Sequence, residues 1–345
     1  MTGIMTGKIL VTGASGFIGS FIVEEALQRG FEVWAAMRRS SSRQFLTDSR
    51  IHFIELDLSS EETLVEQLRG HAFDYVVHAA GVTKCLHKDD FFRINTQGTQ
   101  NLVRALLKLE MPLRRFVYVS SLSIMGAIRE QQPYTEILES DEPQPNTVYG
   151  KSKLETERWL VRLNEELKGK GKNTLPYVVL RPTGVYGPRE RDYFMMAKSI
   201  KAHTDFAVGY QQQDITFVYV SDVVQAVFLA MEKGETGRAY FLSDGEVYQS
   251  STFSDLIHHE LGNPWWIRIT APLWVLRLIT FFGEYVGRLT GKVTALNNDK
   301  YNIMRQRNWR CDITPARREL GYEPQVKLEE GVRRSIQWYK ENGWL

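Results

Sequence analysis

The feature that most constrains this chain is a group of three glycines between an expected strand and an expected helix. Residues 8–20 are KILVTGASGFIGS, in which the apolar run at 8–12 predicts a buried strand and the residues from 17 onward repeat with helical spacing. Glycines in this spacing permit a tight turn, let a pyrophosphate approach the backbone, and let helix and strand pack closely. With the positive end of the helix beside them, they predict dinucleotide binding. The residues expected to contact the dinucleotide here are Gly13, Ser15, Gly16, Phe17, Ile18 and Gly19.

Short apolar runs then alternate with helical patterns, which is typical of a parallel sheet covered by helices on both faces. The expected strands are Lys8–Thr12, Glu32–Met37, His52–Glu55, Tyr75–His78, Phe116–Ser120 and Tyr177–Leu180. A further strand and helix within 217–240 are expected to return to the same sheet. We therefore predict an α/β fold, a Rossmann-type doubly wound parallel sheet formed by residues 1–180 and 217–243. A smaller C-terminal substrate-binding domain is expected to comprise residues 181–216 and 244–345.

Composition excludes several classes of protein. The formal net charge is only +2, so no strong positive field indicates a nucleic-acid partner. Two cysteines, Cys85 and Cys311, form neither a disulfide framework nor a metal-binding cluster, and His258 and His259 have no partners at metal-ligand spacing. We expect no metal. No secretory signal precedes the first strand, which favours a cytoplasmic protein.

Residues 264–290 are unusually rich in tryptophan, leucine, isoleucine and phenylalanine. Charged residues and Pro272 interrupt the segment, so it does not have the pattern of a membrane-spanning helix. Pro272 is suited to the first turn of a helix that is apolar around most of its circumference. Three interpretations stay open: a buried core helix, a lid over the substrate, or a peripheral contact with a membrane.

Tyr149 and Lys153 lie four residues apart on an expected helix, and therefore on one face of it. A nearby ammonium stabilises tyrosinate and lowers the pKa of the phenol, which would make Tyr149 an acid or base near neutral pH. The pair follows the strand 116–120, whose carboxyl end carries Ser121 and Ser123. Ligands of open parallel sheets bind at that end, so we expect Ser121 to hold a substrate oxygen. The alternative role of these serines is a turn or a helix cap.

The residues that follow the second expected strand indicate which cofactor is bound. Arg38 and Arg39 come directly after Met37, and no acidic residue occurs among 38–43. A carboxylate near this place usually binds the ribose 2′-hydroxyl of NAD, whereas arginine matches the 2′-phosphate of NADP. We therefore predict NADP, with NAD as the second choice, against the alternative of a solvated basic loop.

Six motifs occur in order along the chain: TGASGFIG, HAAG, NTQGTQNL, VSSLSIMG, YGKSK and RPTGVYGPR. Together they resemble the extended short-chain dehydrogenase/reductases, over nearly the full length. The resemblance implies that Ser121, Tyr149 and Lys153 are catalytic and that Asn95 supports the active-site helix. It further implies cofactor contacts from Asp57, Leu58, Ala79, Ala80, Gly81, Tyr149, Lys153, Pro182 and Val185. Substrate contacts are expected from Thr83, Ser121, Ser123 and Tyr186, and the resemblance suggests a homodimer.

The substrate is less constrained. Nucleotide-sugar members of the family tend to carry an arginine just before the expected strand that begins at Phe217, and this chain has Ile215 there. Isoleucine cannot bind a diphosphate, and the aromatic residues of 265–282 suit an apolar molecule. We therefore expect an NADP-dependent enzyme that interconverts a ketone and a secondary alcohol on a sterol-like or long-chain lipid. It resembles the 3-beta-hydroxysteroid dehydrogenase, dihydroflavonol reductase and bacterial ceramide reductase branches.

Two other functions stay open. One is a nucleotide-sugar epimerase or dehydratase with tightly held NAD(P), in which Arg181, Tyr186, Arg189 and Arg191 would bind phosphates. The other is a dinucleotide-binding sensor or scaffold without chemistry, against which the presence of Ser121, Tyr149 and Lys153 argues.

Overall fold

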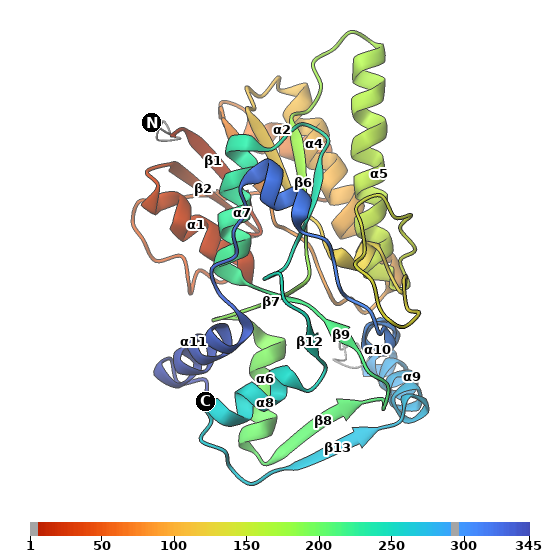
Figure 1. The fold of residues 1–345 in the computed structure, drawn as a ribbon. Helices are drawn as coiled ribbons and strands as arrows, with labels where there is room; N and C mark the ends of the chain where they lie inside the picture. Colours follow the sequence, from red (N-terminus) through yellow and green to blue (C-terminus); the bar gives the residue numbers. More distant parts are fainter. Residues whose placement is uncertain (1–5, 291–296) are drawn as a thin grey trace.

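The expected strands form one large parallel sheet. The computed structural model describes residues 6–290 and 297–345, without the side chains of 286–289, and contains seven parallel strands in the order β11-β6-β5-β4-β1-β2-β3 (Figure 1). Their bounds are β1 (Lys8–Thr12), β2 (Glu32–Met37), β3 (His52–Glu55), β4 (Tyr75–His78), β5 (Arg115–Val119), β6 (Tyr177–Pro182) and β11 (Ala239–Leu242). All six strands expected in the first half of the chain belong to this sheet, which confirms the predicted fold class.

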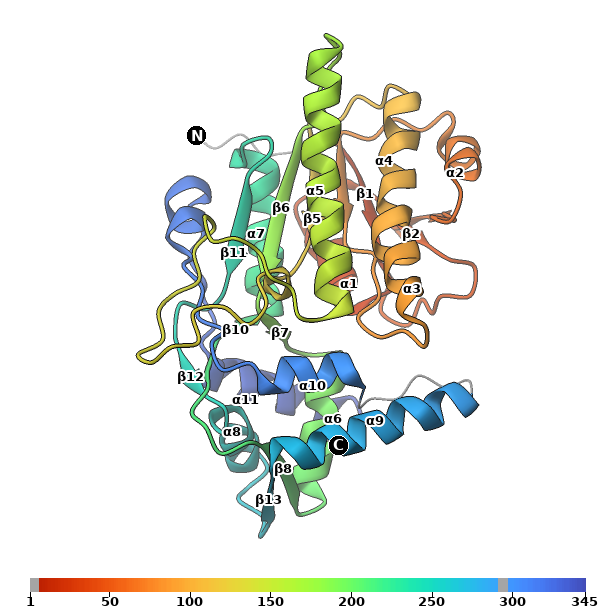
Figure 2. The ribbon, with the colours of Figure 1, turned by 90° about the vertical axis from the view of Figure 1, so that its right-hand side faces the viewer.

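Helices cover both faces of the sheet (Figure 2). Helices α1 (Phe17–Gln28) and α7 (Val220–Lys233) pack on one face; α2 (Glu61–Leu68), α4 (Gly98–Lys108) and α5 (Val148–Gly169) pack on the other. Within β1, Ile9 and Val11 belong to the first core and Leu10 to the second. Because both faces are buried, such a strand is apolar throughout and shows no alternation with polar residues.

The strand order reverses at the centre of the sheet. Strand β1 pairs with β2 on one side and with β4 on the other, and the chain reaches β4 only after β3 and α2. The carboxyl ends of β1 and β4 therefore flank a topological switch point, where open α/β sheets bind their ligands.

The expectation for residues 217–240 was partly wrong. The strand β10 (Phe217–Tyr219) pairs with β7 (Gly184–Tyr186) in a separate two-stranded sheet, because the chain is still outside the large sheet at this point. Only α7 and the edge strand β11 return to the large sheet. Residues 311–322 also contribute side chains to the core around α7. The division into two domains stays a prediction. Residues 1–5 of the first predicted domain and residues 291–296 of the second lie outside the described residues.

Several of the remaining elements pack around a third core, which includes Tyr186 and Phe253. Two further strand pairs occur here: β8 (Thr204–Val208) with β13 (Ile267–Ala271), and β9 (Asp214–Ile215) with β12 (Tyr248–Gln249). The helices are α6 (Arg191–Lys201), α8 (Thr252–Glu260), α9 (Leu273–Thr290), α10 (Asn298–Arg305) and α11 (Leu328–Glu341). Shorter helical turns are α3 (Lys88–Phe91), η1 (Phe92–Gln97), η2 (Leu122–Ile124) and η3 (Ala316–Leu320).

Helix α9 begins directly after Pro272, as expected. The interpretation of α9 as a core helix is wrong, because Trp274, Leu278 and Phe281 are half or more exposed. Within the described residues, no helix has the length and hydropathy that are needed to cross a membrane.

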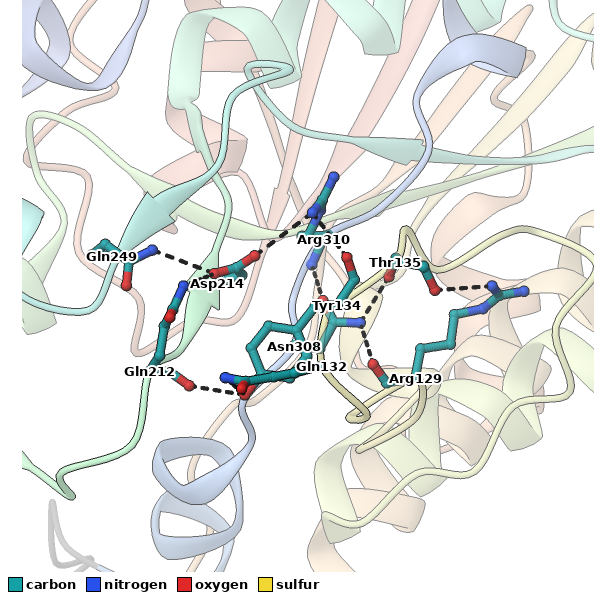
Figure 3. A network of polar contacts seen from close by, with 9 residues as sticks. All are labelled: Arg129, Gln132, Tyr134, Thr135, Gln212, Asp214, Gln249, Asn308 and Arg310. Carbon is teal, nitrogen blue, oxygen red and sulfur yellow. Dashed lines mark hydrogen bonds and ion pairs between the residues drawn. The ribbon is translucent and has the colours of Figure 1, made fainter.

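A network of polar contacts around the buried Asn308 joins residues 308–310 to two other segments (Figure 3). Asn308 is fully buried; its Nδ2 donates to the carbonyl oxygens of Arg129 (3.1 Å) and Thr135 (2.9 Å), and its Oδ1 accepts from the backbone N–H of Arg310. The Arg310 guanidinium donates to the Tyr134 carbonyl oxygen and lies 3.7 Å from the carboxylate of Asp214. These contacts fix the segment that leads from α10 back to the large sheet.

We expect Asn308→Ala to lower the free energy of unfolding by about 2–3 kcal/mol, because it removes the buried amide that binds two carbonyl groups and one N–H group. Denaturant unfolding measures the change. Asn342→Ala is the matched control: the Asn342 amide donates to one carbonyl oxygen at an exposed helix end, so its loss should cost less than about 0.5 kcal/mol. An equal loss of unfolding free energy in the two variants would show that the contacts of Asn308 do not stabilise the fold.

Candidate active site

The glycine turn has the geometry that a bound pyrophosphate requires. Gly13 has a φ of +69°, and a Cβ there would lie 2.7 Å from the backbone nitrogen of Ala80. A Cβ at Gly19 would lie 2.1 Å from the carbonyl oxygen of Gly13. Only glycine fits at these two positions, so the backbone of β1 and the start of α1 stay open to a ligand.

A cleft of about 550 Å³ extends from this turn along the carboxyl ends of the strands. It contains most of the residues that the sequence indicated. Its predicted members are Gly13, Gly16, Phe17, Ile18, Gly19, Ala79, Gly81, Thr83, Ser121, Ser123, Tyr149, Lys153, Pro182 and Val185. The cleft thus brings the glycine turn, the serines after β5 and the Tyr149/Lys153 pair together, and its size is typical of a small-molecule site.

Other predicted contacts lie outside the described lining of this cleft: Ser15, Arg38, Arg39, Asp57, Leu58, Ala80, Asn95 and Tyr186. The substrate contact predicted for Tyr186 is wrong, since its side chain is fully buried against Gly331 and its hydroxyl donates to the Lys327 carbonyl oxygen. Two of the proposed phosphate-binding arginines are already paired. Arg181 lies 2.6 Å from Glu157, and Arg189 lies 2.7 Å from Glu24.

The electrostatics of Tyr149 differ from the prediction. Burial raises the pKa of the phenol to about 12, and a hydrogen bond with Ser121 lowers it in part. The Lys153 ammonium was expected to lower this pKa, but it donates instead to the Val119 carbonyl oxygen at 2.9 Å and lies 4.7 Å from the centre of the Tyr118 ring. Tyr149 is therefore a protonated phenol at neutral pH in this arrangement, able to donate a proton.

Burial lowers the pKa of Lys153 to about 8, from 10.5. The unfolded chain therefore binds the proton more tightly than the folded one, so Lys153 costs stability below about pH 8, and this cost disappears as the pH rises through the unfolded pKa. We expect the stability of wild-type protein relative to Lys153→Met to increase by roughly 2 kcal/mol between about pH 7 and about pH 10. Denaturant unfolding of both proteins at the two pH values measures this. A constant difference would show that the Lys153 ammonium is not destabilised by its surroundings.

Buried hydrogen bonds fix the position of α5, which carries Tyr149 and Lys153. Asn95 lies in the π-helical turn η1, where its amide donates to Ser152 Oγ and to the Val82 carbonyl oxygen. Next to it, Thr96 Oγ1 donates to the Ser152 carbonyl oxygen at 2.8 Å. Asn95 thus contacts α5 without lining the cleft, which is the geometry of a positioning residue. One turn after Lys153, the buried carboxylate of Glu157 accepts from Ser120 Oγ and from Arg181.

The sequence did not indicate a contribution from α10. A carboxylate oxygen of Asp299 accepts the backbone N–H groups of Val148 (2.9 Å) and Tyr149 (3.1 Å) at the start of α5. The next residue, Lys300, lies 3.7 Å from Asp192, which also accepts from Lys84. Both Asp299 and Lys300 line the cleft. Asn297 caps α10, and a helix start is the only signal that the sequence gave for this segment.

A second cavity, of about 340 Å³, adjoins the cleft at Ser121 and Ser123. Its lining includes Ile215, so the residue that replaces the expected arginine does face this space. Apolar side chains supply much of the rest: Leu122, Met196, Phe206, Val208, Phe217, Phe253, Ile303, Met304 and Trp309. No arginine occurs in its described lining, and Lys300 is its one lysine. Within the described residues there is also no cluster of side chains able to hold a metal ion.

Comparison with known proteins agrees with this architecture. A family model described as the NAD dependent epimerase/dehydratase family matches residues 9–243. The decarboxylating sterol-4-alpha-carboxylate 3-dehydrogenase of Candida albicans is 24% identical, over 97% of this chain and 98% of that protein. A putative UDP-glucose 4-epimerase of Methanocaldococcus jannaschii is 26% identical, over 97% and 99%. The solved structure of an epimerase from Methanothermobacter thermautotrophicus superposes with a TM-score of 0.79 at 22% identity, over 99% and 97% of the two chains, which shows a shared fold.

Proposed function

The chain belongs to the NAD dependent epimerase/dehydratase family, and we propose that it is an NADP-dependent oxidoreductase that interconverts a ketone and a secondary alcohol on a sterol-like or long-chain lipid. The observation that carries this proposal is the cavity beside Ser121, whose described lining is largely apolar and contains no arginine. An apolar substrate gains free energy by leaving water there. A diphosphate would lose its hydration there and find Lys300 as the one cationic side chain in the described lining, 3.7 Å from the carboxylate of Asp192.

The residues of the cleft supply the remaining parts of the reaction. Tyr149 donates its phenolic proton to the ketone oxygen, and the Ser121 hydroxyl orients that oxygen by a hydrogen bond. The glycine turn would hold the pyrophosphate, and Lys153 the ribose next to the nicotinamide. When bound, the nicotinamide supplies the hydride that reduces the ketone carbon, or accepts it in the reverse direction. A sterol dehydrogenase among the relatives supports an apolar substrate.

The preference for NADP rests on Arg38 and Arg39. Both follow the end of β2, both are exposed, and neither pairs with a carboxylate among the described residues. A free guanidinium group forms two parallel hydrogen bonds with a phosphate.

We expect the double variant Arg38→Ala/Arg39→Ala to bind NADPH about 100-fold more weakly and to bind NADH with little change, because each charge-assisted hydrogen bond contributes about 1.5–3 kcal/mol. Fluorescence titration with both cofactors measures this. Arg50→Ala is a suitable control, since Asp48 already engages that guanidinium. An equal loss for the two cofactors would contradict the assignment of a 2′-phosphate site.

A nucleotide-sugar epimerase or dehydratase is the second candidate, supported by the putative UDP-glucose 4-epimerase among the relatives. One experiment separates the two functions. The purified protein is incubated with NADPH and either lipid ketones or nucleotide sugars, while nicotinamide absorbance and product mass are followed. We expect stoichiometric oxidation of NADPH with a lipid ketone. Conversion of a nucleotide sugar without net oxidation of the cofactor would overturn the proposal. We also propose that the protein is a homodimer whose interface contains α5. Light scattering in solution measures the oligomeric state.

A further inference from the structure

Helix α9 carries a large apolar face that no described part of the protein covers. Leu276 and Thr280 are buried against the rest of the molecule. The exposed side chains are Trp274 (66%), Leu278 (50%), Ile279 (45%), Phe281 (66%), Phe282 (60%) and Tyr285 (59%). A surface helix of a globular protein normally exposes polar residues, and a contiguous apolar patch of this kind marks an interaction site.

Exposed apolar side chains also occur on the ribbon that β8 and β13 form next to α9. Helix α9 lies on the outer side of α10, away from the seven-stranded sheet (Figures 1 and 2), and follows β13 directly. In that ribbon, Ile269 of β13 pairs with Phe206 of β8, and these side chains are 46% and 63% exposed. Exposed apolar side chains thus occur both on α9 and on the β8–β13 pair, where Phe206 also lines the cavity beside Ser121.

Positive charge accompanies the patch. Two shallow grooves flank α9, one lined by Trp274, Leu278 and Phe281 and the other by Pro272 and Leu273. Arg277 lines the first groove, and Arg305 and Arg307 line the second. No guanidinium group of these three arginines pairs with a carboxylate among the described residues, although the backbone N–H of Arg307 donates to the carboxylate of Glu130 at 2.7 Å. Glu284 is the one acidic side chain in the described lining of either groove.

The second groove leads to the cavity beside Ser121. Val208, Gln213 and Met304 line both the groove and the cavity. An apolar molecule that enters between the start of α9 and the end of α10 would reach the cavity along a groove in which Val208, Pro272 and Leu273 supply apolar surface.

We propose that α9, the β8–β13 ribbon and these three arginines form a docking surface for an anionic lipid bilayer, placed so that an apolar substrate passes from the bilayer into the cavity. The passage of substrate from the bilayer into the cavity rests on the proposed function, whereas the docking to the bilayer does not. Exposed aromatic side chains on one helix, together with arginines whose guanidinium groups have no carboxylate partner among the described residues, match the interfacial region of a bilayer and its anionic headgroups. A second copy that docked symmetrically through this same surface would bring the arginines of the two copies close together, which is unfavourable.

The test measures binding to vesicles by cosedimentation. We expect wild-type protein to bind vesicles that contain phosphatidylglycerol at least about tenfold more tightly than vesicles of phosphatidylcholine alone, because three arginines face anionic headgroups. The triple variant Trp274→Ser/Phe281→Ser/Tyr285→Ser should lose binding by at least about tenfold, since it removes three side chains that would enter the interface. The control Phe92→Ser/Val247→Ser removes exposed apolar side chains elsewhere and should bind as wild type does.

Two further measurements separate a loss of vesicle binding from a loss of folding or of catalysis. Thermal unfolding of the triple variant should match that of wild type within about 2 °C, because the replaced side chains are exposed. Turnover of a short, water-soluble ketone should be unchanged, so failure of that turnover in wild type would count against the proposed function and not against docking. Absence of wild-type binding to every vesicle composition would overturn the docking proposal. So would an oligomer that dissociates in the triple variant.

Discussion

A Tyr149→Phe variant is expected to bind NADPH as wild-type protein does and to lose about 100- to 10,000-fold in kcat, the usual contribution of a positioned acid or base. The phenol lines the cleft beside Ser121, and burial raises its pKa to about 12, so it is protonated at neutral pH and can donate a proton. Stopped-flow measurement of NADPH oxidation reports the chemical step, and cofactor fluorescence reports binding.

The matched control for this experiment is Tyr285→Phe, which removes the same hydroxyl group from an exposed position on α9. It should leave kcat with a soluble ketone unchanged. Thermal unfolding checks that Tyr149→Phe stays folded, with a loss of about 1 kcal/mol expected for one hydrogen bond. Turnover by Tyr149→Phe at the wild-type rate would show that another group transfers the proton.

Gly19→Ala is expected to weaken dinucleotide binding by at least about 100-fold, a change of about 2.7 kcal/mol. Its Cβ would lie 2.1 Å from the Gly13 carbonyl oxygen, which is backbone and cannot turn aside. Gly13 itself has a φ of +69° and contacts the backbone at Ala79 and Ala80, so the turn cannot relax without moving β4. Isothermal titration with NADPH measures the loss.

Gly169→Ala provides the comparison for this variant. A Cβ at Gly169 meets nothing within 4 Å, and this glycine is the last residue of α5. Its replacement should leave cofactor affinity unchanged. Equal affinity of Gly19→Ala and wild-type protein would mean that the dinucleotide does not bind at the glycine turn.

The sequence predicted those features that depend on neighbouring residues in the chain. The strands from β1 to β6 are short apolar runs, so their positions followed from composition and spacing alone. The six motifs predicted the family correctly, because each combines a residue type with a fixed place between a strand and a helix. The glycine turn is the clearest example: its steric requirement is local, and the structure meets it at Gly13 and Gly19.

Features that depend on distant segments were not predictable. Strand β10 is apolar like the strands of the large sheet, but its partner is β7, and no local pattern distinguishes the two pairings. Asp299 is separated from Tyr149 by 150 residues, so its contact with the start of α5 could not be inferred from spacing. The environment of Lys153 was also missed, because four-residue spacing predicts a shared helix face but not the carbonyl oxygen of Val119 that binds the ammonium.

The central claim is that Tyr149 and a dinucleotide on the glycine turn reduce a ketone held beside Ser121. Transfer of deuterium tests it most directly: the protein is incubated with NADPH that carries deuterium at the transferable position of the nicotinamide, and with a long-chain ketone. We predict that mass spectrometry finds one deuterium on the new carbinol carbon and that one NADPH is consumed per alcohol. An alcohol without deuterium, or an unchanged ketone alongside an isomerised nucleotide sugar, would contradict the account.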